Sequence, residues 1–185
     1  SYYVIQYIDG QSLDSLIAAK GRLSTNETVG ITRQVGSALS CMHSKGMLHL
    51  DVKPANVMMA DEKTAILIDF GLSKQYDQNG QPESSTTVGS GTPGYAPIEQ
   101  ANHREGKDFP VQMDVYALGA TMLKMLTGQR PPEASDILNF GFPKKELLAV
   151  GVTLSVAMVV EKAMAPQQNK RYKTVNDFLK ALDIA

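Results

Sequence analysis

The chain has 185 residues, with 18 Lys and Arg against 19 Asp and Glu and a formal net charge of -1. This balance argues against a general nucleic-acid-binding protein, because phosphate contacts require an excess of basic side chains. The one cysteine, Cys41, excludes an internal disulfide and a cysteine-based zinc cluster. We expect Cys41 to be buried in a helix, in a protein of the reducing cytoplasm. No apolar run reaches the roughly 18 residues of a membrane helix, so we expect no membrane segment.

The first predicted elements are a strand and two helices. The alternating segment YYVIQYI at 2–8 predicts a strand, and Asp9-Gly10 predicts the turn after it. Ser12 is typical of the cap of a short helix. Ser24 with Glu27 forms a capping box, which predicts an amphipathic helix of about twenty residues.

Two short strands are predicted next, within 47–59 and 64–72, on either side of a polar turn at 61–63. The polar composition of 74–92 predicts a mobile loop, because it offers few apolar side chains to bury.

Three more helices are predicted in the second half of the chain. The segment 111–127 is apolar on all faces and ends at Gly128, which predicts a central buried helix. Further helices are predicted over 152–164 and after a cap at Thr174. The expected fold is therefore mainly α with a few short β-strands, in a single domain over 1–185.

Side chains with catalytic chemistry lie at 49–56 and 69. If the two short strands form a hairpin, Asn56 and Asp69 lie side by side, as oxygen ligands suited to Mg²⁺. Asp51 can then orient or deprotonate a hydroxyl, and Lys53 can supply charge for a phosphoryl group. For the Asp and Asn residues the alternative is simple turn formation, which their joint spacing makes less attractive.

The motif His49-Leu-Asp-Val-Lys-Pro-Ala-Asn56, followed by Asp69-Phe-Gly71, closely resembles the catalytic loop and metal-binding triplet of eukaryotic-type protein kinases, including bacterial Ser/Thr members. The resemblance implies an ATP- and Mg²⁺-dependent enzyme that transfers the γ-phosphate to Ser or Thr hydroxyls of proteins. It implies Asp51 and Lys53 as catalytic residues and Asn56 and Asp69 as ligands of the metal and its nucleotide. It gives His49 a structural role.

Later motifs extend the resemblance. The segment 91–99, GTPGYAPIE, is similar to the end of the kinase activation loop, with Ile98 where the family usually has Pro. The family pattern implies that Glu99 pairs with Arg171 and that Asp114 holds the backbone of the catalytic loop. It also implies that Thr92 bonds the catalytic Asp and Lys, as in kinases acting on Ser or Thr.

The opening segment resembles the last small-lobe strand and the hinge of a kinase, over 1–10. This implies Ile5 as gatekeeper, adenine bonded by the backbone of Gln6 and Ile8, and Met58 in the apolar floor under adenine. We therefore expect the large C-terminal lobe of a protein-kinase-like fold, whose whole domain is α+β. The small N-terminal lobe, with its Gly-rich loop and strand lysine, is expected outside this chain as a partner, so the fragment alone is expected to be inactive.

One departure from the family is Leu50, where many members have an arginine that binds a phosphorylated activation loop. We hypothesise that activity does not require loop phosphorylation. We expect His43 and His103 to be surface residues without a specific role.

Two other classes of function remain open. A pseudokinase would use the lobe for partner binding, and the absence of the strand lysine from the full gene would favour it. A small-molecule phosphotransferase of the aminoglycoside or choline type shares the His-x-Asp…Asn loop, but the segments around 91–97 and 114–119 are features of the protein-directed branch.

Overall fold

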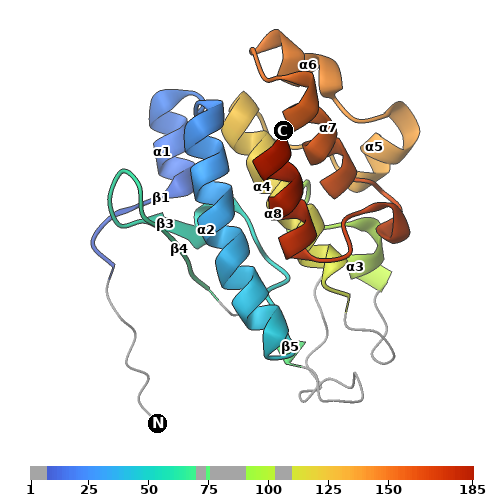
Figure 1. Cartoon of the computed structure of the whole chain (residues 1–185), viewed down its shortest axis with the longest axis horizontal. Coiled ribbons are helices and arrows are strands. Elements are labelled where there is room, and N and C mark those ends of the chain that lie inside the picture. Colours follow the sequence, from blue (N-terminus) through green and yellow to red (C-terminus); the bar gives the residue numbers. More distant parts are fainter. Residues whose placement is uncertain (1–7, 70–73, 76–90, 103–109) are drawn as a thin grey trace.

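The computed structural model describes residues 8–69, 74–75, 91–102 and 110–185 (Figure 1). Helices dominate this part of the chain and the strands are short, which confirms the predicted class. The helices are α1 Leu13–Lys20, α2 Thr25–Ser44, α3 Ile98–Asn102, α4 Gln112–Thr127, α5 Ala134–Phe140, α6 Lys144–Ala149, α7 Leu154–Ala163 and α8 Val175–Ile184. The strands are β1 Gln11–Ser12, β2 Met47–Leu48, β3 Val57–Met59, β4 Ala65–Leu67 and β5 Lys74–Gln75.

The central helix α4 is buried on every face, as its uniformly apolar sequence predicts. It contacts α2, α6, α7 and α8. It ends at Gly128, whose φ of 72° is in the left-handed region. A Cβ there would lie 1.9 Å from the carbonyl oxygen of Gly21, so only glycine fits this crossing.

The predicted helix starts are confirmed. Ser12 accepts from the amide of Ser15 at 3.1 Å, and Ser24 and Glu27 form the reciprocal capping box that begins α2. Thr174 forms a second capping box at the start of α8. These local signals set where α1, α2 and α8 begin.

The predicted hairpin is also confirmed. Strands β3 and β4 pair antiparallel, with Val57 opposite Leu67, and β1 adds to the other edge of β3. The amide of Ile68 donates to the carbonyl of Asn56 at 2.9 Å, so the pairing continues beyond the strands. This contact brings the end of the 49–56 loop next to the segment that leads into Asp69.

Several elements differ from the predictions. The residues Lys74 and Gln75, predicted to be loop, form β5, which pairs antiparallel with β2. The helices α3, α5 and α6 were not predicted, because each is short and carries few apolar positions to reveal a period. The predicted strand over 2–8, apart from Ile8, and the remaining predicted loop over 76–90 lie outside the described residues.

Two side-chain predictions on α2 were wrong. Cys41 is exposed rather than buried. His43 is not a surface residue, since its side chain is only 10% exposed and is paired with Asp114. Both residues lie in the last turns of α2, which contacts β2, the strand just before the loop at 49–56. Within the described ranges, no helix has both the length and the apolar character needed to cross a bilayer.

Candidate active site

The loop at 49–56 is fixed to the core by Asp114, a fully buried carboxylate on α4. Its Oδ2 accepts from the amide of His49 at 2.9 Å, and its Oδ1 accepts from the amide of Leu50 at 2.8 Å. This geometry confirms the predicted backbone-holding role of Asp114. The backbone of the loop is therefore held in place by the buried helix α4.

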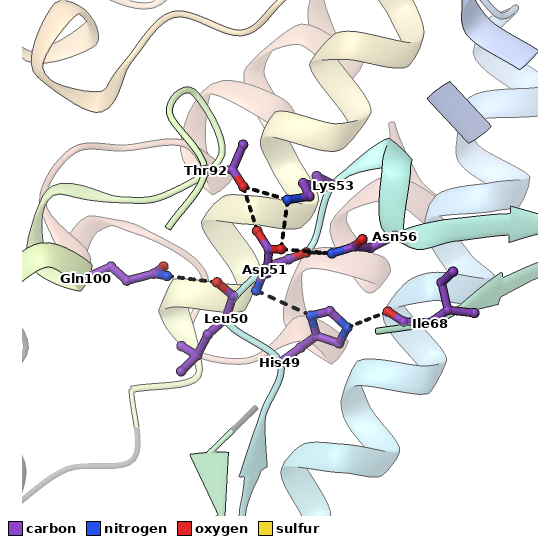
Figure 2. A network of polar contacts seen from close by, with 8 residues as sticks. All are labelled: His49, Leu50, Asp51, Lys53, Asn56, Ile68, Thr92 and Gln100. Carbon is purple, nitrogen blue, oxygen red and sulfur yellow. Dashed lines mark hydrogen bonds and ion pairs between the residues drawn. The ribbon is translucent and has the colours of Figure 1, made fainter. Parts of the chain in front are cut away.

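His49 is buried and has a structural position. Its Nδ1 accepts from the amide of Asp51 at 3.3 Å, and its Nε2 lies 3.1 Å from the carbonyl oxygen of Ile68. Both bonds are satisfied by the neutral tautomer that carries the proton on Nε2. The ring thus links the loop to the end of the β3–β4 hairpin (Figure 2).

Asp51, Lys53 and Thr92 form a closed triangle of polar contacts (Figure 2). The hydroxyl of Thr92 donates to Asp51 Oδ1 at 2.7 Å and accepts from Lys53 Nζ at 2.8 Å. Lys53 Nζ also lies 2.8 Å from Asp51 Oδ2. The carboxylate is thus fixed by a cation and a hydroxyl, and part of it still reaches solvent, with 12% of the side chain exposed. The contacts implied for Thr92 by the kinase resemblance are present.

Asn56 is oriented by Asp51. Its amide nitrogen donates to the Asp51 backbone carbonyl at 2.8 Å and to Asp51 Oδ2 at 3.0 Å. Figure 2 shows the amide nitrogen turned toward Asp51 and the amide oxygen turned away. The two bonds to Asp51 use the amide nitrogen and leave the amide oxygen pointing away from Asp51. The oxygen is the atom that a hard cation would bind.

Asp69 directly follows Ile68, the residue bonded to the Asn56 carbonyl. Its backbone has a φ of 63°, which is uncommon outside glycine, and its side chain is exposed. The hairpin thus brings the chain at Asn56 and at Asp69 together, as predicted. An amide oxygen and a carboxylate fit Mg²⁺, which binds few protein ligands beside substrate phosphates. The described residues contain no cluster of three or more His, Cys, Asp or Glu that could hold a metal by themselves.

Of the predicted adenine-binding residues, Ile8 and Met58 are described and both are half-buried. Met58 lies in β3 between Ser12 of β1 and Ile66 of β4, on the face opposite to the buried Val57 and Met59. A side chain there can cover a ligand lying on the sheet. Gln6 and Ile5 lie outside the described residues.

The segment 91–99 is fixed by the predicted pair of Glu99 and Arg171. The guanidinium of Arg171, whose side chain is fully buried, donates to Glu99 Oε1 at 2.5 Å and to Oε2 at 3.1 Å. Arg171 also donates to three backbone carbonyls, those of Gln112, Ala165 and Pro166. This bidentate pair anchors α3, and with it the end of the segment that carries Thr92.

Sequence reasoning missed two residues around the loop. His43 Nε2 lies 2.8 Å from Asp114 Oδ2, and the buried amide of Gln100 donates to the carbonyl of Leu50 at 2.8 Å. The position of His43 one turn after the buried Leu39 could have revealed it. Nothing in the local pattern around Gln100 indicated its contact, which spans 50 residues.

Leu50 is buried against Leu48 and Met113, so its side chain offers no polar group to a phosphorylated loop. The hypothesis that activity is independent of loop phosphorylation stays a prediction.

The sequence is similar to known proteins along almost its whole length. The sequence profile of the family described as "Protein kinase domain" matches residues 1–182. The serine/threonine-protein kinase PknA of Nostoc is 31% identical over 191 residues, covering 99% of this chain and 33% of the relative. PknB of Mycobacterium tuberculosis is 27% identical over 180 residues, covering 94% of this chain and 28% of the relative.

A third relative, PknB of Mycolicibacterium smegmatis, is 30% identical over 182 residues, again covering 94% of this chain and 28% of the relative. The chain therefore spans about a third or less of the length of these bacterial serine/threonine kinases. Since the family profile covers almost every residue, this chain belongs to the protein kinase domain family.

Proposed function

We propose that this chain is the large, catalytic lobe of a protein serine/threonine kinase that transfers the γ-phosphate of ATP to protein hydroxyls. The observation that carries the proposal is the triangle of Asp51, Lys53 and Thr92, with its 2.7–2.8 Å contacts. A carboxylate fixed beside a cation at a solvent-reaching edge is suited to orienting a hydroxyl for phosphoryl transfer. Thr92 adds support, because it connects the segment 91–99 to that carboxylate.

Within this proposal Asp51 orients the acceptor hydroxyl and takes up its proton. Lys53 neutralises negative charge on the transferring phosphoryl group, at a position fixed by its contact with Asp51 Oδ2. Thr92 keeps both groups in one geometry. Most of the rate enhancement in such a site comes from this positioning and from charge stabilisation.

Asn56 and Asp69 would hold Mg²⁺, through one amide oxygen and one carboxylate. The Asn56 amide is oriented for this by its two bonds to Asp51, and Asp69 is exposed at the end of the hairpin. Bound there, Mg²⁺ would supply charge neutralisation for the nucleotide phosphates. The backbone of Gln6 and Ile8 would bind adenine, with Met58 beneath it.

We further propose that a small lobe outside these 185 residues supplies the Gly-rich loop and the strand lysine. The chain alone would then be inactive, while the full-length protein would act in the cytoplasm, where ATP is available. The alignments support this proposal, because they cover 94–99% of this chain but only 28–33% of the length of the relatives, which therefore contain further segments.

The test is phosphate transfer by the full-length protein from labelled ATP, with the product residue identified by mass spectrometry. We expect label on Ser or Thr of a protein acceptor, and its loss in Asp69→Ala. No transfer by a correctly folded protein would favour the pseudokinase. Transfer to a small hydroxylated compound, without protein labelling, would favour the small-molecule phosphotransferase.

A further inference from the structure

Gln100 is a buried polar side chain that contacts the residue immediately before Asp51. It lies on α3 and is only 2% exposed, and its Nε2 donates to the carbonyl oxygen of Leu50 at 2.8 Å. That carbonyl belongs to the peptide bond joining Leu50 to Asp51. Any rotation of this peptide changes where the Asp51 carboxylate points.

The backbone at Leu50 needs such support. Its φ of 67° lies in the left-handed region, which is unfavourable for a bulky residue with a Cβ. Its amide is bonded to Asp114 on one side and its carbonyl to Gln100 on the other. The two bonds, from α4 and α3, together keep an otherwise unfavourable conformation.

The space around Gln100 is fitted to its amide. A Cβ at Gly91 would lie 2.5 Å from the Ala96 Cβ and 2.7 Å from the Gln100 Nε2, so a larger residue there would force at least one of these side chains to move. Gly91 has a φ of 71° and precedes Thr92, which bonds Asp51 itself. Figure 2 shows Gln100 and Thr92 reaching Leu50 and Asp51 from the same segment. Both ends of the segment 91–100 therefore contact consecutive residues of the catalytic loop.

We propose that Gln100 is a positioning residue for phosphoryl transfer, which acts by fixing the Leu50–Asp51 peptide. With Thr92, it makes the segment 91–100 a brace for the Asp51 carboxylate. The contact is made by the neutral amide of Gln100 with the backbone carbonyl of Leu50. It therefore needs neither a charged side chain at position 50 nor a phosphate group. This inference rests on the proposed kinase function, since it assigns a role relative to Asp51.

The test is Gln100→Met in the full-length protein, which keeps the side-chain length and removes the donor. We expect kcat for transfer to a protein acceptor to fall about ten- to a hundredfold, the effect of a small misplacement of a reacting group. The KM for ATP should change less than about twofold, because no adenine-binding residue is touched. Hydrogen exchange at the amide of Asp51 should accelerate, reporting the loosened peptide.

The matched control is Gln34→Met on α2. The Gln34 amide makes comparable bonds, to the Lys63 carbonyl at 2.7 Å and from the Ala65 amide at 2.9 Å, at the far end of the hairpin. The control should lower the melting temperature and leave kcat unchanged. If Gln100→Met does not fold, Gln100→Asn keeps an amide that is one methylene too short, and the same fall in kcat is expected.

An unchanged kcat in a folded Gln100 variant, with only a lower melting temperature, would show that Gln100 merely anchors α3. An Asp51→Asn variant in the same assay distinguishes a failure of the positioning role of Gln100 from a failure of the proposed kinase function. If Asp51→Asn is inactive and Gln100→Met is normal, only the positioning role fails. If Asp51→Asn is fully active, the proposed function itself fails.

Discussion

At the scale of single residues, the polar side chains around Asp51 are each oriented by hydrogen bonds to their neighbours. One buried carboxylate, Asp114, accepts from the amides of His49 and Leu50 and also contacts His43. A buried carboxylate requires such compensation, because desolvation is costly for an uncompensated charge. The same contacts orient the loop that carries Asp51, so core stability and site geometry depend on the same bonds.

The hydroxyl of Thr92 is predicted to matter through its two bonds to Asp51 and Lys53. Thr92→Val keeps the shape and removes the hydroxyl, so kcat of the full-length protein should fall about tenfold or more, the value of a hydrogen bond to a charged group. Thr92→Ser keeps the hydroxyl and should retain most of the activity in the same steady-state assay. Equal activity of the Val and Ser variants would contradict a positioning role for this hydroxyl.

At the scale of elements, the anchoring of α3 depends on the buried pair of Arg171 and Glu99. Arg171→Met removes five donated bonds and leaves the Glu99 carboxylate without its partner. We expect a loss of about 3–5 kcal/mol in the free energy of unfolding, measured by urea denaturation. Glu99→Gln should cost less, because an amide oxygen still accepts from the guanidinium. A loss below about 1 kcal/mol for Arg171→Met would mean that the pair contributes only like a surface salt bridge.

Glu27, at the start of α2, makes a contribution to the free energy of unfolding that depends on pH. Its bond to Lys20, followed by its bonds to Ser24, lowers the pKa of the Glu27 carboxyl from 4.5 to about 2. Because the folded pKa is below the unfolded one, this stabilisation is present above about pH 4.5 and is lost as the pH falls toward 2. The Glu27 side chain is 42% exposed, so solvent screening limits the contribution to about 1 kcal/mol or less.

The corresponding measurement is the melting temperature of wild type and Glu27→Gln across this pH range. The difference between them should be present at neutral pH and should shrink below about pH 4.5. A difference that stays constant with pH would show that the capping box acts through shape and neutral hydrogen bonds alone.

Local signals predicted much of the fold, and long-range pairing accounts for what they missed. The caps at Ser12, Ser24 and Thr174 were predictable because each bond joins residues three apart. Strand β5 was not, because its two residues pair through backbone groups with β2, and no side-chain pattern encodes that.

The candidate site divides in the same way. The spacing of Asp51, Asn56 and Asp69 indicated a hairpin-built site, and the hairpin is present. The left-handed backbone at Leu50, the buried Gln100 and the His43–Asp114 pair depend on contacts between distant segments. Such contacts follow from the packing of α2, α3 and α4 around the loop and have no period in the sequence.

At the scale of the whole molecule, α4 connects the hydrophobic core to the candidate active site. Its buried faces contact α2, α6, α7 and α8, while Asp114 in its first turn accepts from two amides of the loop at 49–56. The membership of the chain in the protein kinase domain family is consistent with this arrangement. A rigid helical body thus positions a loop whose Asp51 carboxylate remains partly exposed to solvent.

The most direct measurement is kcat for Ser/Thr phosphorylation by the full-length protein carrying Asp51→Asn, compared with Asp61→Asn. Asp61 is an exposed carboxylate that caps the hairpin turn through the amides of Lys63 and Thr64, far along the hairpin from Asn56. We predict that Asp51→Asn lowers kcat by about a hundredfold or more with little change in melting temperature, while Asp61→Asn leaves kcat unchanged. Full activity of a folded Asp51→Asn protein would contradict the assignment of this loop as the site of phosphoryl transfer.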